Sequence, residues 1–423
     1  MSPTEARRDF AVEVVRVLRS AGYQALWAGG CVRDLILGRE PTDYDVATNA
    51  RPEQVVRLFR RTLSVGASFG VIMVLGPNRA GDVEVATFRG DGEYLDGRRP
   101  SSVHYGDARL DASRRDFTIN GLFLDPETDE IIDYVGGRAD LEAGVIRAIG
   151  DPRARFAEDK LRLLRAVRFA ARLEMTIEPA TFEAIHEMAG QVTVVAAERI
   201  AQELRRMLGD SHRAVAFSTL AGLGMLGEIL PSMAWAGGQQ RRESWLNVLN
   251  ALDKLPESPS FPLALATLLH AVEPEADAAR LVNDDCRALK LANDERERIV
   301  WLVASQAAKI EPGTGSESRL KRLLSHPGAT DLLAFRRAIA LATTGDDSAV
   351  SRAEAYLRDE PEGPINPLPI LTGGDLIRHG LKPGPEFSGL LEAVRDAQLE
   401  RRIGTVEDSL ALVDRLRTEK AGG

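Results

Sequence analysis

The order of elements in residues 28–48 limits what this chain can fold into more than any other stretch. The run AGGCVRDLILGREPTDYDVAT predicts the end of a short strand, two glycines, a helix, and a second strand that carries Asp43 and Asp45. Side chains two residues apart on a strand point to the same face, so these carboxylates would repel each other unless a cation lies between them. Mg²⁺ prefers such oxygen ligands, often together with substrate phosphates. A lone pair of acids near a turn is more often simply solvated, so the neighbouring residues decide between the two interpretations.

The glycines before the helix favour a phosphate site. Gly29 and Gly30 precede a predicted helix whose free N–H groups can bind an anion, although two glycines can also serve only a turn. Arg33 lies one turn inside this helix and adds further donors. In VEVATF, Glu84 is either a third acid of the site or an exposed strand residue. These residues together predict a site for the phosphates of a nucleotide and two metal ions.

Hydrophobic periodicity divides the chain into a strand-bearing part and a helical part. Short strands alternate with helices at first, whereas after Asp151-Pro152 nearly every segment has helical spacing. The run RDEPEGPINPLP, with four prolines, is the clearest linker. We therefore predict an α+β fold, in which a mixed-sheet head is followed by helices. The predicted parts are the head at residues 1–145, a helical neck at 146–210, a helical body at 211–357 and a helical tail at 358–423.

Charge is unevenly distributed along the 423 residues. The net charge of −9 argues against a protein that binds nucleic acid over its whole surface. Residues 147–172 nevertheless carry eight bases and three acids, which fits an anionic ligand at one defined place. No apolar run is long enough for a transmembrane helix, and the first residues lack a signal-peptide pattern, so a cytoplasmic protein is expected. Cys31 and Cys286 are far apart in sequence and propose neither a disulfide framework nor a metal site.

Four further runs follow these features in order. They are RRDFTINGLFLD (114–125), DYVGGRADL (133–141), AEDKLRLLRAVRFAARL (157–173) and AERIAQEL (197–204). With GGCVRD and DYD before them, the ordered set resembles the class II tRNA nucleotidyltransferases, which comprise the bacterial CCA-adding enzymes and their poly(A) polymerase relatives. The resemblance is close over residues 25–205 and implies a nucleotidyltransferase head followed by a helical neck, body and tail, and the tail is expected to bind tRNA.

The resemblance implies a role for each matching residue. Asp43 and Asp45 would be the catalytic residues and would hold the metal ions, and Glu84 would join or support them. It also implies Mg²⁺ as cofactor, with two ions, and CTP, ATP and the 3′ end of tRNA as partners. The implied nucleotide-binding residues are Gly29, Gly30, Arg33 and Arg115 at the triphosphate, Asp116 and Asn120 at the sugar or in organising the loop, Asp159 and Arg162 at the base, and Arg165 and Arg168 toward phosphate or RNA.

Base selection without a template is the distinctive property of this family, and the resemblance places it in EDKLRLLRAVRF. Asp159 and Arg162 are three residues apart and would face the same way on a helix. A carboxylate accepts from the amino group that cytosine and adenine share, and arginine donates to a ring nitrogen. Such a pair would reject uracil and guanine, which carry a carbonyl in place of the amino group. The alternative is a salt bridge with i, i+3 spacing on a solvated helix face.

Several activities are compatible with these motifs. Full CCA addition releases pyrophosphate at each step and is the predicted function. Residues 89–113 fill the position of the family's flexible loop, which is needed for the switch from C to A, so addition of C alone is disfavoured. Addition of the terminal A alone and poly(A) synthesis remain open, although SVGASFGVIMVL resembles the CCA-adding enzymes.

Functions of other kinds are less well supported by the motifs. A nucleotide-binding RNA-interaction protein without turnover would not need both aspartates. An antibiotic-modifying nucleotidyltransferase would not need the base-reading helix or so large a helical body. Ala271 follows His270 where a His-Asp phosphohydrolase domain would carry an aspartate, so phosphohydrolase activity is not expected.

Overall fold

The structure is a computed structural model that describes residues 3–66, 70–77, 80–91, 103–273, 275–313, 316–359 and 365–421. The chain divides into two compact units. Unit 1 consists of Met1–Gln239 with Ala288–Lys290, and unit 2 of Gln240–Arg287 with Leu291–Gly423. An α+β fold with a mixed sheet at the start and helices after it is confirmed. The division into head, neck, body and tail is finer than these two units and stays a prediction.

Unit 1 contains a seven-stranded mixed sheet with the strand order β3-β4-β5-β2-β1-β8-β9. β2 and β5 run parallel, and the other neighbouring strands are antiparallel. The register of β2 and β5 places Asp45 opposite Glu84, so two of the predicted acids lie side by side. The strands are β1 (Ala25–Ala28), β2 (Asp45–Thr48), β3 (Thr62–Gly66), β4 (Val71–Leu75), β5 (Asp82–Thr87), β8 (Leu122–Leu124) and β9 (Ile131–Asp133).

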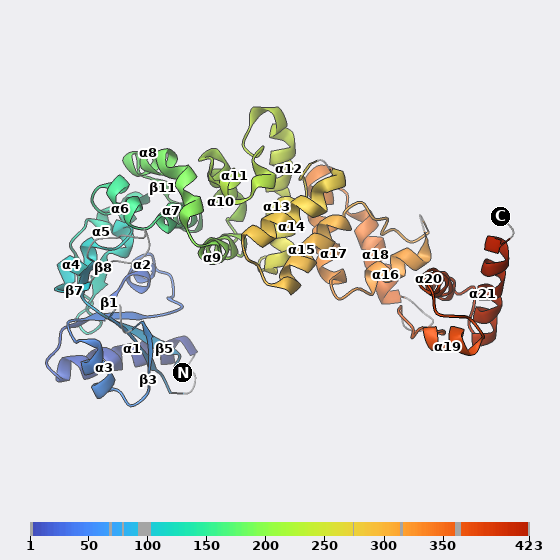
Figure 1. The fold of residues 1–423 in the computed structure, drawn as a ribbon. Coiled ribbons are helices and arrows are strands. Elements are labelled where there is room, and N and C mark those ends of the chain that lie inside the picture. The colour runs from blue at the N-terminus through green and yellow to red at the C-terminus, as the bar shows by residue number, and fades with distance from the viewer. Residues whose placement is uncertain are drawn as a thin grey trace. The chain divides into compact units, whose positions relative to one another are not determined.

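Helices and two small strand pairs complete unit 1 (Figure 1). The strand pairs are β6 (Arg89–Asp91) with β7 (Val103–Tyr105), which are antiparallel, and β10 (Val145–Ile146) with β11 (Thr176–Ile177), which are parallel. The α-helices are α1 (Pro3–Ser20), α2 (Gly30–Ile36), α3 (Pro52–Leu58), α4 (Ala108–Ser113), α5 (Gly137–Ala143), α6 (Pro152–Glu158), α7 (Leu161–Leu173), α8 (Pro179–Met188), α9 (Ala197–Leu208), α10 (Arg213–Gly222) and α11 (Met225–Ile229). The 3₁₀ helices are η2 (Thr118–Asn120), η3 (Ala189–Val194), η4 (Pro231–Met233) and η5 (Gln239–Arg241).

Burial on both faces explains the apolar sequence of β1. All four of its residues are buried. On one face, the indole Nε1 of Trp27 donates to the carbonyl of Ala11 in α1 at 3.4 Å. On the other face, Leu26 joins a cluster that includes Phe123 of β8. A strand covered on both faces has a continuous apolar sequence. Because β1 is buried in this way, it fixes the position of Gly29, which follows it at the edge of the core.

Two details of the fold differ from the sequence predictions. The strand predicted over DYDVAT begins only at Asp45, so Asp43 lies just before it. The helix predicted through AEDKLRLLRAVRF is interrupted, because α6 ends at Glu158 and α7 begins at Leu161. Asp159 has an extended backbone, and its side chain accepts from the N–H of Leu161 at 3.0 Å. An aspartate that bonds the first turn of the next helix competes with helix continuation, which accounts for the break.

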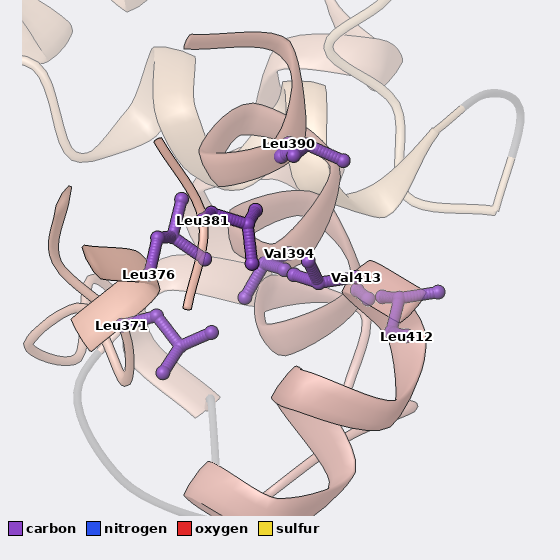
Figure 2. Packing of buried hydrophobic residues seen from close by; sticks show 8 residues of the cluster. Leu371, Leu376, Leu381, Leu390, Val394, Leu412 and Val413 are labelled. Atoms are coloured by element: carbon purple, nitrogen blue, oxygen red, sulfur yellow. The ribbon is translucent and has the colours of Figure 1, made fainter. Parts of the chain in front are cut away.

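Unit 2 is helical throughout its described residues (Figure 1). Its last three helices share a core of their own, formed mainly by leucine and valine side chains (Figure 2). The residues of this cluster are Leu371, Leu376, Leu381, Leu390, Val394, Ala397, Leu412 and Val413. The α-helices are α12 (Arg242–Asp253), α13 (Phe261–Leu269), α14 (Ala278–Ala288), α15 (Asn293–Ala304), α16 (Glu317–Leu324), α17 (Ala329–Thr343), α18 (Ser348–Asp359), α19 (Gly373–Arg378), α20 (Glu386–Leu399) and α21 (Val406–Ala421), with the 3₁₀ helix η6 (Glu275–Asp277). In the part of the chain that the structure describes, none of the helices has the length and apolar character needed to cross a membrane.

Candidate nucleotide site

A cavity of about 560 Å³ lies in unit 1, between the sheet and the start of α7. Seven arginines and four carboxylates are among its lining residues, and this excess of positive charge suits a ligand with several negative charges. Two residues predicted for the site, Asp43 and Arg168, are not among those that line it. The predicted residues that the cavity does bring together are Gly29, Gly30, Arg33, Asp45, Glu84, Arg115, Asp116, Asn120, Asp159, Arg162 and Arg165.

The turn from β1 into α2 requires a glycine. Gly29 has a φ of +73° and donates its N–H to the carbonyl of Leu122 at 3.0 Å. A Cβ on Gly29 would lie only 2.8 Å from Nη1 of Arg115. Gly30 has more room, because a Cβ there would lie 3.8 Å from Nη2 of Arg33. The left-handed backbone and the close approach of Arg115 therefore both select glycine at position 29.

A chain of hydrogen bonds connects α2 to α7 across the cavity. Nη1 of Arg33 donates to Oδ1 of Asn120 at 2.7 Å, and the amide of Asn120 donates to Oδ1 of Asp116 at 3.1 Å. Arg165 donates to Oδ2 of Asp116 at 2.7 Å. Burial opposes the charge of Asp116, but the Arg165 charge and the hydrogen bonds outweigh it and lower the pKa of this carboxyl to about 2. Asp116 is thus ionised at neutral pH and holds Arg165 in place.

Most arginines of the cavity are already paired with a carboxylate. Six of the lining arginines make the salt bridges given below. Because arginine has five N–H donors and a carboxylate contact uses one or two of them, the paired groups keep donors for a phosphate or a base. The pairs are Arg33–Asp34 (2.7 Å), Arg114–Asp111 (2.6 Å), Arg115–Asp111 (2.9 Å), Arg162–Glu158 (2.5 Å), Arg165–Asp116 (2.6 Å) and Arg199–Asp159 (2.7 Å).

The acids of β2 and β5 form the negative part of the cavity. Asp43 and Asp45 are exposed on either side of Tyr44, whose ring is buried against Trp27 at 4.7 Å between centroids. This alternation points both carboxylates away from the core, as predicted for a strand. Burial, together with the charges of Glu84 and Asp43, raises the pKa of Asp45 to about 6, although the charge of Arg115 acts against this increase. The pKa of Glu84 is also raised, chiefly by burial.

The donor set at these acids fits a divalent cation. Two carboxylates in register on parallel strands raise the cost of ionising Asp45, and a cation between them would remove that cost. Among the residues that the structure describes, no group of three or more His, Cys, Asp or Glu side chains is close enough to form a complete metal site. The protein side chains would therefore supply only part of the coordination, and substrate oxygens and water the rest, as is usual for Mg²⁺.

Asp159 and Arg162 both line the cavity, but not in the arrangement predicted for one continuous helix. Asp159 lies between α6 and α7, and Arg162 in the first turn of α7. The salt bridge considered between them is not formed. Asp159 instead accepts two hydrogen bonds from Arg199 of α9, at 3.1 and 2.7 Å. Nη1 of Arg162 donates to Glu158 at 2.5 Å, so each member of the pair is oriented by a different partner.

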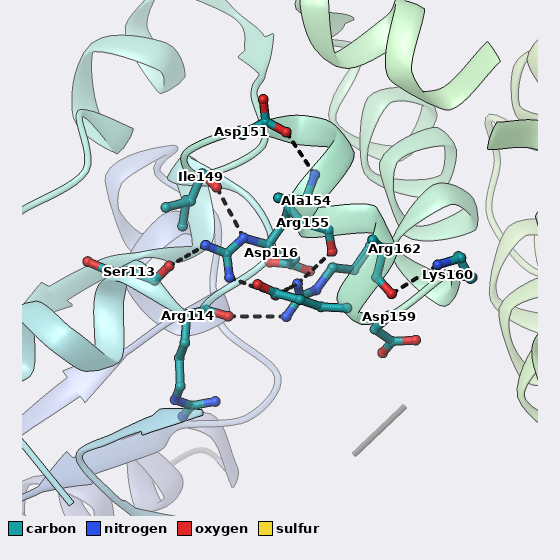
Figure 3. A network of polar contacts seen from close by, with 12 residues as sticks. Ser113, Arg114, Asp116, Ile149, Asp151, Ala154, Arg155, Asp159, Lys160 and Arg162 are labelled. Carbon is teal, nitrogen blue, oxygen red and sulfur yellow. Dashed lines mark hydrogen bonds and ion pairs between the residues drawn. The ribbon is translucent and has the colours of Figure 1, made fainter. Parts of the chain in front are cut away.

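Backbone carbonyls of the segment RRD are held by arginines of α6 and α7 (Figure 3). Nη2 of Arg155 donates to the carbonyl of Ser113 at 2.7 Å, and Nη2 of Arg162 donates to the carbonyl of Arg114 at 3.1 Å. Glu158 accepts from both arginines, at 2.9 and 2.5 Å. This network fixes the end of α4 against α6 and α7, and thus close to Asp159, which lies between these helices, and to Arg162 in the first turn of α7.

Arg168 faces away from the cavity. Its Nε donates to Glu203 of α9 at 2.5 Å, and both side chains are more than nine-tenths buried. Its guanidinium also lies 4.1 Å from the ring centroid of Phe169, which does line the cavity. Arg33 and Arg165 approach the same ring at 5.3 and 5.1 Å. The structure therefore places Arg168 in the packing between α7 and α9 rather than on the basic stripe toward a ligand.

Several lining residues were not among the predicted ones, and three of them lie in the motifs described above. Arg114, Phe169 and Arg199 all line the cavity. Arg114, Phe169 and Arg199 lie in the motifs RRDFTING, RAVRFAARL and AERIAQEL, on which the family resemblance rests. These motifs could therefore have indicated that the three residues belong to the site. Spacing within a single segment gives no sign, however, that Arg199 contacts Asp159, which lies 40 residues away.

Two other sequence predictions concern regions beside or apart from this cavity. Of the predicted loop at residues 89–113, the structure describes β6, β7 and α4, while residues 92–102 lie outside the described residues. His270 is buried, and its Nδ1 lies 2.7 Å from the carbonyl of Thr267. Burial lowers the pKa of His270, which fits the predicted packing role.

Comparisons with known proteins match these motifs and this architecture. Residues 25–147 match the family described as the poly A polymerase head domain, and residues 174–236 match a probable RNA and SrmB-binding site of polymerase A. A CCA-adding enzyme of Lactiplantibacillus plantarum is 33% identical over 408 residues, which are 95% of this chain and 94% of that protein. A poly(A) polymerase I of Haemophilus influenzae is 32% identical over 80% of this chain and 82% of its own.

A solved structure shows the same relationship in three dimensions. The crystal structure of the Bacillus stearothermophilus CCA-adding enzyme in complex with CTP superimposes with a TM-score of 0.79 at 28% identity, and the match covers 100% of both chains. Similarity over nearly the whole length, together with the ordered motifs, leaves one assignment. The chain belongs to the nucleotidyltransferase family that comprises the CCA-adding enzymes and the bacterial poly(A) polymerases.

Proposed function

We propose that this protein adds C and A nucleotides from CTP and ATP to the 3′ end of tRNA, without a nucleic-acid template. The observation that carries the proposal is that one cavity holds the strand acids, a group of arginines and the Asp159–Arg162 pair. A nucleoside triphosphate needs these three kinds of contact at its reacting phosphate, its phosphate chain and its base. The CCA-adding enzyme of Lactiplantibacillus plantarum matches 95% of this chain, and the poly(A) polymerase I of Haemophilus influenzae matches 80%.

In the proposed reaction, the 3′ oxygen of the RNA attacks the α-phosphorus of the bound nucleotide. The bond from the α-phosphorus to the bridging oxygen breaks, and pyrophosphate leaves. Arg33 and Arg115 neutralise the phosphate chain, where charge increases as the bond breaks. Asn120 orients both of them, because Nη1 of Arg33 donates to its Oδ1 at 2.7 Å and Nη1 of Arg115 donates to its backbone carbonyl at 3.2 Å.

Members of this nucleotidyltransferase family generally depend on a divalent metal. We propose Mg²⁺, as two ions, with Asp43, Asp45 and Glu84 as the protein ligands. When bound, such ions supply activation of the attacking hydroxyl and stabilisation of the leaving oxygen. Asp43 lies before β2 and outside the lining, so of the two aspartates it is Asp45 that the cavity itself presents.

The base would be selected by donors and acceptors that the protein contacts leave available. A carboxylate has about four acceptor positions, of which Arg199 and the N–H of Leu161 occupy three at Asp159. Arg162 uses its Nη1 group and one N–H of Nη2 in contacts with protein atoms. Its Nε–H and the second N–H of Nη2 would then serve a ring nitrogen or the cytosine carbonyl.

The test is incubation of the protein with labelled CTP or ATP, Mg²⁺ and tRNA that lacks its 3′ CCA. Full CCA addition predicts two C residues followed by one A and then arrest. A long A tract would instead show poly(A) synthesis, and addition only to tRNA that ends in CC would show an enzyme restricted to the terminal A. If well-folded protein incorporates no nucleotide into any RNA, the remaining hypothesis is a protein that binds nucleotides without catalysing their transfer.

Variants of the acids give the control for this test. Asp43→Ala and Asp45→Ala are expected to lower transfer at least about a hundredfold, because they remove groups that act on the reacting phosphate. Glu53→Ala removes an exposed carboxylate of α3 and should keep full activity. Near-normal transfer by both aspartate variants would disprove the assignment of the acids.

A further inference from the structure

Asp111 is a buried carboxylate next to the cavity but not part of its lining. It lies on α4, and only 1% of its side chain is exposed. Oδ1 accepts from Nε and Nη2 of Arg114 at 2.9 and 2.6 Å, and Oδ2 accepts from Nε and Nη2 of Arg115 at 3.1 and 2.9 Å. One carboxylate therefore orients two guanidinium groups, each through two donors.

Both arginines line the cavity, and the position of Arg115 is defined closely. Its Nη1 donates to the carbonyl of Asn120 at 3.2 Å and lies where a Cβ on Gly29 would approach to 2.8 Å. Its guanidinium carbon also lies 5.1 Å from the ring centroid of Phe123. Arg115 is thus held against the glycine turn by contacts on several sides, and Asp111 supplies two of its hydrogen bonds.

The backbone of the same segment is held independently. Arg155 and Arg162 donate to the carbonyls of Ser113 and Arg114, as Figure 3 shows. Loss of Asp111 would leave these backbone contacts in place. It would remove two hydrogen bonds and a charged partner from each of Arg114 and Arg115. A variant at this position can therefore test the orientation of the two side chains separately from the fold of the segment.

We propose that Asp111 is a positioning residue, which aims Arg114 and Arg115 at the phosphate chain of the incoming nucleotide. The inference rests on the proposed function, because it concerns the phosphates of that substrate. One carboxylate between two guanidiniums leaves a net positive charge for the triphosphate. The arginine charges outweigh the cost of burial and lower the pKa of Asp111, so this carboxyl is ionised throughout the neutral range.

The test compares Asp111→Asn with the wild type in binding and in transfer. Asparagine keeps the size of the side chain but loses the charge that holds two guanidiniums, and hydrogen bonds to charged groups are the stronger ones. We expect the dissociation constant for CTP to increase about tenfold, with a similar increase for ATP. Binding of CMP, which lacks the β- and γ-phosphates, should change less than about threefold. KM for both triphosphates should increase more than kcat decreases, and the preference for C and A should be kept.

An electrostatic alternative predicts the opposite sign. If Asp111 acted only through its negative charge, its removal would make the cavity more positive and would tighten CTP binding. Tighter binding, or equal changes for CTP and CMP, would overturn the positioning role. If Asp111→Asn does not fold, Asp111→Glu decides, because it keeps the charge and displaces it by one methylene. A CTP-to-CMP affinity ratio equal to that of the wild type in Asp111→Glu would then overturn the proposal.

Asp107→Ala is the matched control on the same helix. Asp107 caps α4 by accepting from the N–H of Leu110 at 2.8 Å, so its loss weakens the helix without touching the arginine contacts. Its CTP-to-CMP ratio should stay at the wild-type value. Wild-type protein that neither binds CTP nor transfers nucleotides would disprove the proposed function itself. Wild-type activity with an unchanged ratio in Asp111→Asn would disprove only the role of Asp111.

Discussion

Asp45 lies opposite Glu84 on two parallel strands, and burial together with the charge of Glu84 determines how Asp45 responds to pH. The pKa of Asp45 is about 6 in the fold, above its ordinary value of 3.8. Between these two values the folded protein binds a proton that the unfolded chain does not. In the absence of metal, the free energy of unfolding therefore decreases as the pH rises from about 4 to about 6, because the proton that stabilises the folded state is lost.

The same shift predicts a pH dependence of activity. At subsaturating Mg²⁺, transfer should increase as the pH rises through about 6 and level off above it, because only ionised Asp45 can bind the cation. The midpoint should move to lower pH as the Mg²⁺ concentration is raised. Glu84→Gln removes a like charge and should lower the midpoint in metal-binding titrations. A midpoint that depends on neither Mg²⁺ nor Glu84 would assign the pH dependence to another group.

Asp159 should determine which bases are accepted. Asp159→Ala removes the acceptor that we propose for the amino group of cytosine and adenine, and it leaves Arg199 without this carboxylate partner. We expect discrimination against UTP and GTP to fall by about one to two orders of magnitude, since an unpaired polar group costs about 1–3 kcal/mol. The measurement is incorporation of all four nucleotides into truncated tRNA. Full retention of the preference for C and A would place base selection elsewhere.

Individual residues of the cavity could be predicted to different degrees. The place of Gly29, Arg33 and Asp45 in the cavity could be predicted from residues 28–48, because strand, turn and helix follow one another there within a short stretch of sequence. The partners of Asp159 and Arg162 could not be predicted, because they depend on a contact with α9 and on a break in the helix. Sequence spacing gives the face of a residue only while the element is continuous.

At the scale of elements, α7 connects the cavity to the helices behind it. Its side toward the cavity carries Arg162 and Arg165, and its far side carries Arg168, which is paired with Glu203 of α9. The basic stripe seen in the sequence is thus divided between a ligand-facing side and a packed side. A buried pair of this kind is expected to stabilise the contact of the two helices only while both partners are present.

Glu203→Gln tests this division. It leaves the Arg168 charge buried beside a neutral group, so we expect the free energy of unfolding to decrease by about 3–5 kcal/mol. The control is Glu187→Gln, which breaks a pair with Arg153 in which both side chains are about half exposed, and which should cost at most about 1 kcal/mol. Urea titrations at constant pH give both values. Equal small effects would mean that α7 and α9 are held together by apolar packing alone.

At the scale of the whole molecule, the last helices have a core that involves only their own residues (Figure 2). This part follows the proline-rich linker, and its helix-turn-helix pattern could be predicted from the sequence. Its attachment to α16 could not, because it uses the buried Lys321, whose Nζ donates to the carbonyl of Leu399 at 2.9 Å. A single lysine in a helix gives no sign of such a distant partner.

Removal of residues 360–423 tests the predicted tRNA-binding role of the tail. The cavity lies wholly in unit 1, so KM for CTP and transfer to a short acceptor-stem hairpin should stay within about threefold of the wild type. KM for full-length tRNA should increase at least about tenfold, because contacts away from the 3′ end are lost. Equal losses with both RNAs would assign the tail a purely structural role, and thermal unfolding of the truncated protein would show it.

The pairing of the cavity arginines with carboxylates has a consequence for turnover. Each addition ends with a pyrophosphate that must leave before the next nucleotide can enter. The carboxylates of Asp34, Asp111 and Asp116 hold Arg33, Arg115 and Arg165, and they can keep these contacts while a phosphate binds to the remaining N–H donors. When the product departs, each of these arginines therefore keeps a charged partner and is not left as an unpaired buried cation. The same donors are then available in the same orientation for each of the successive additions.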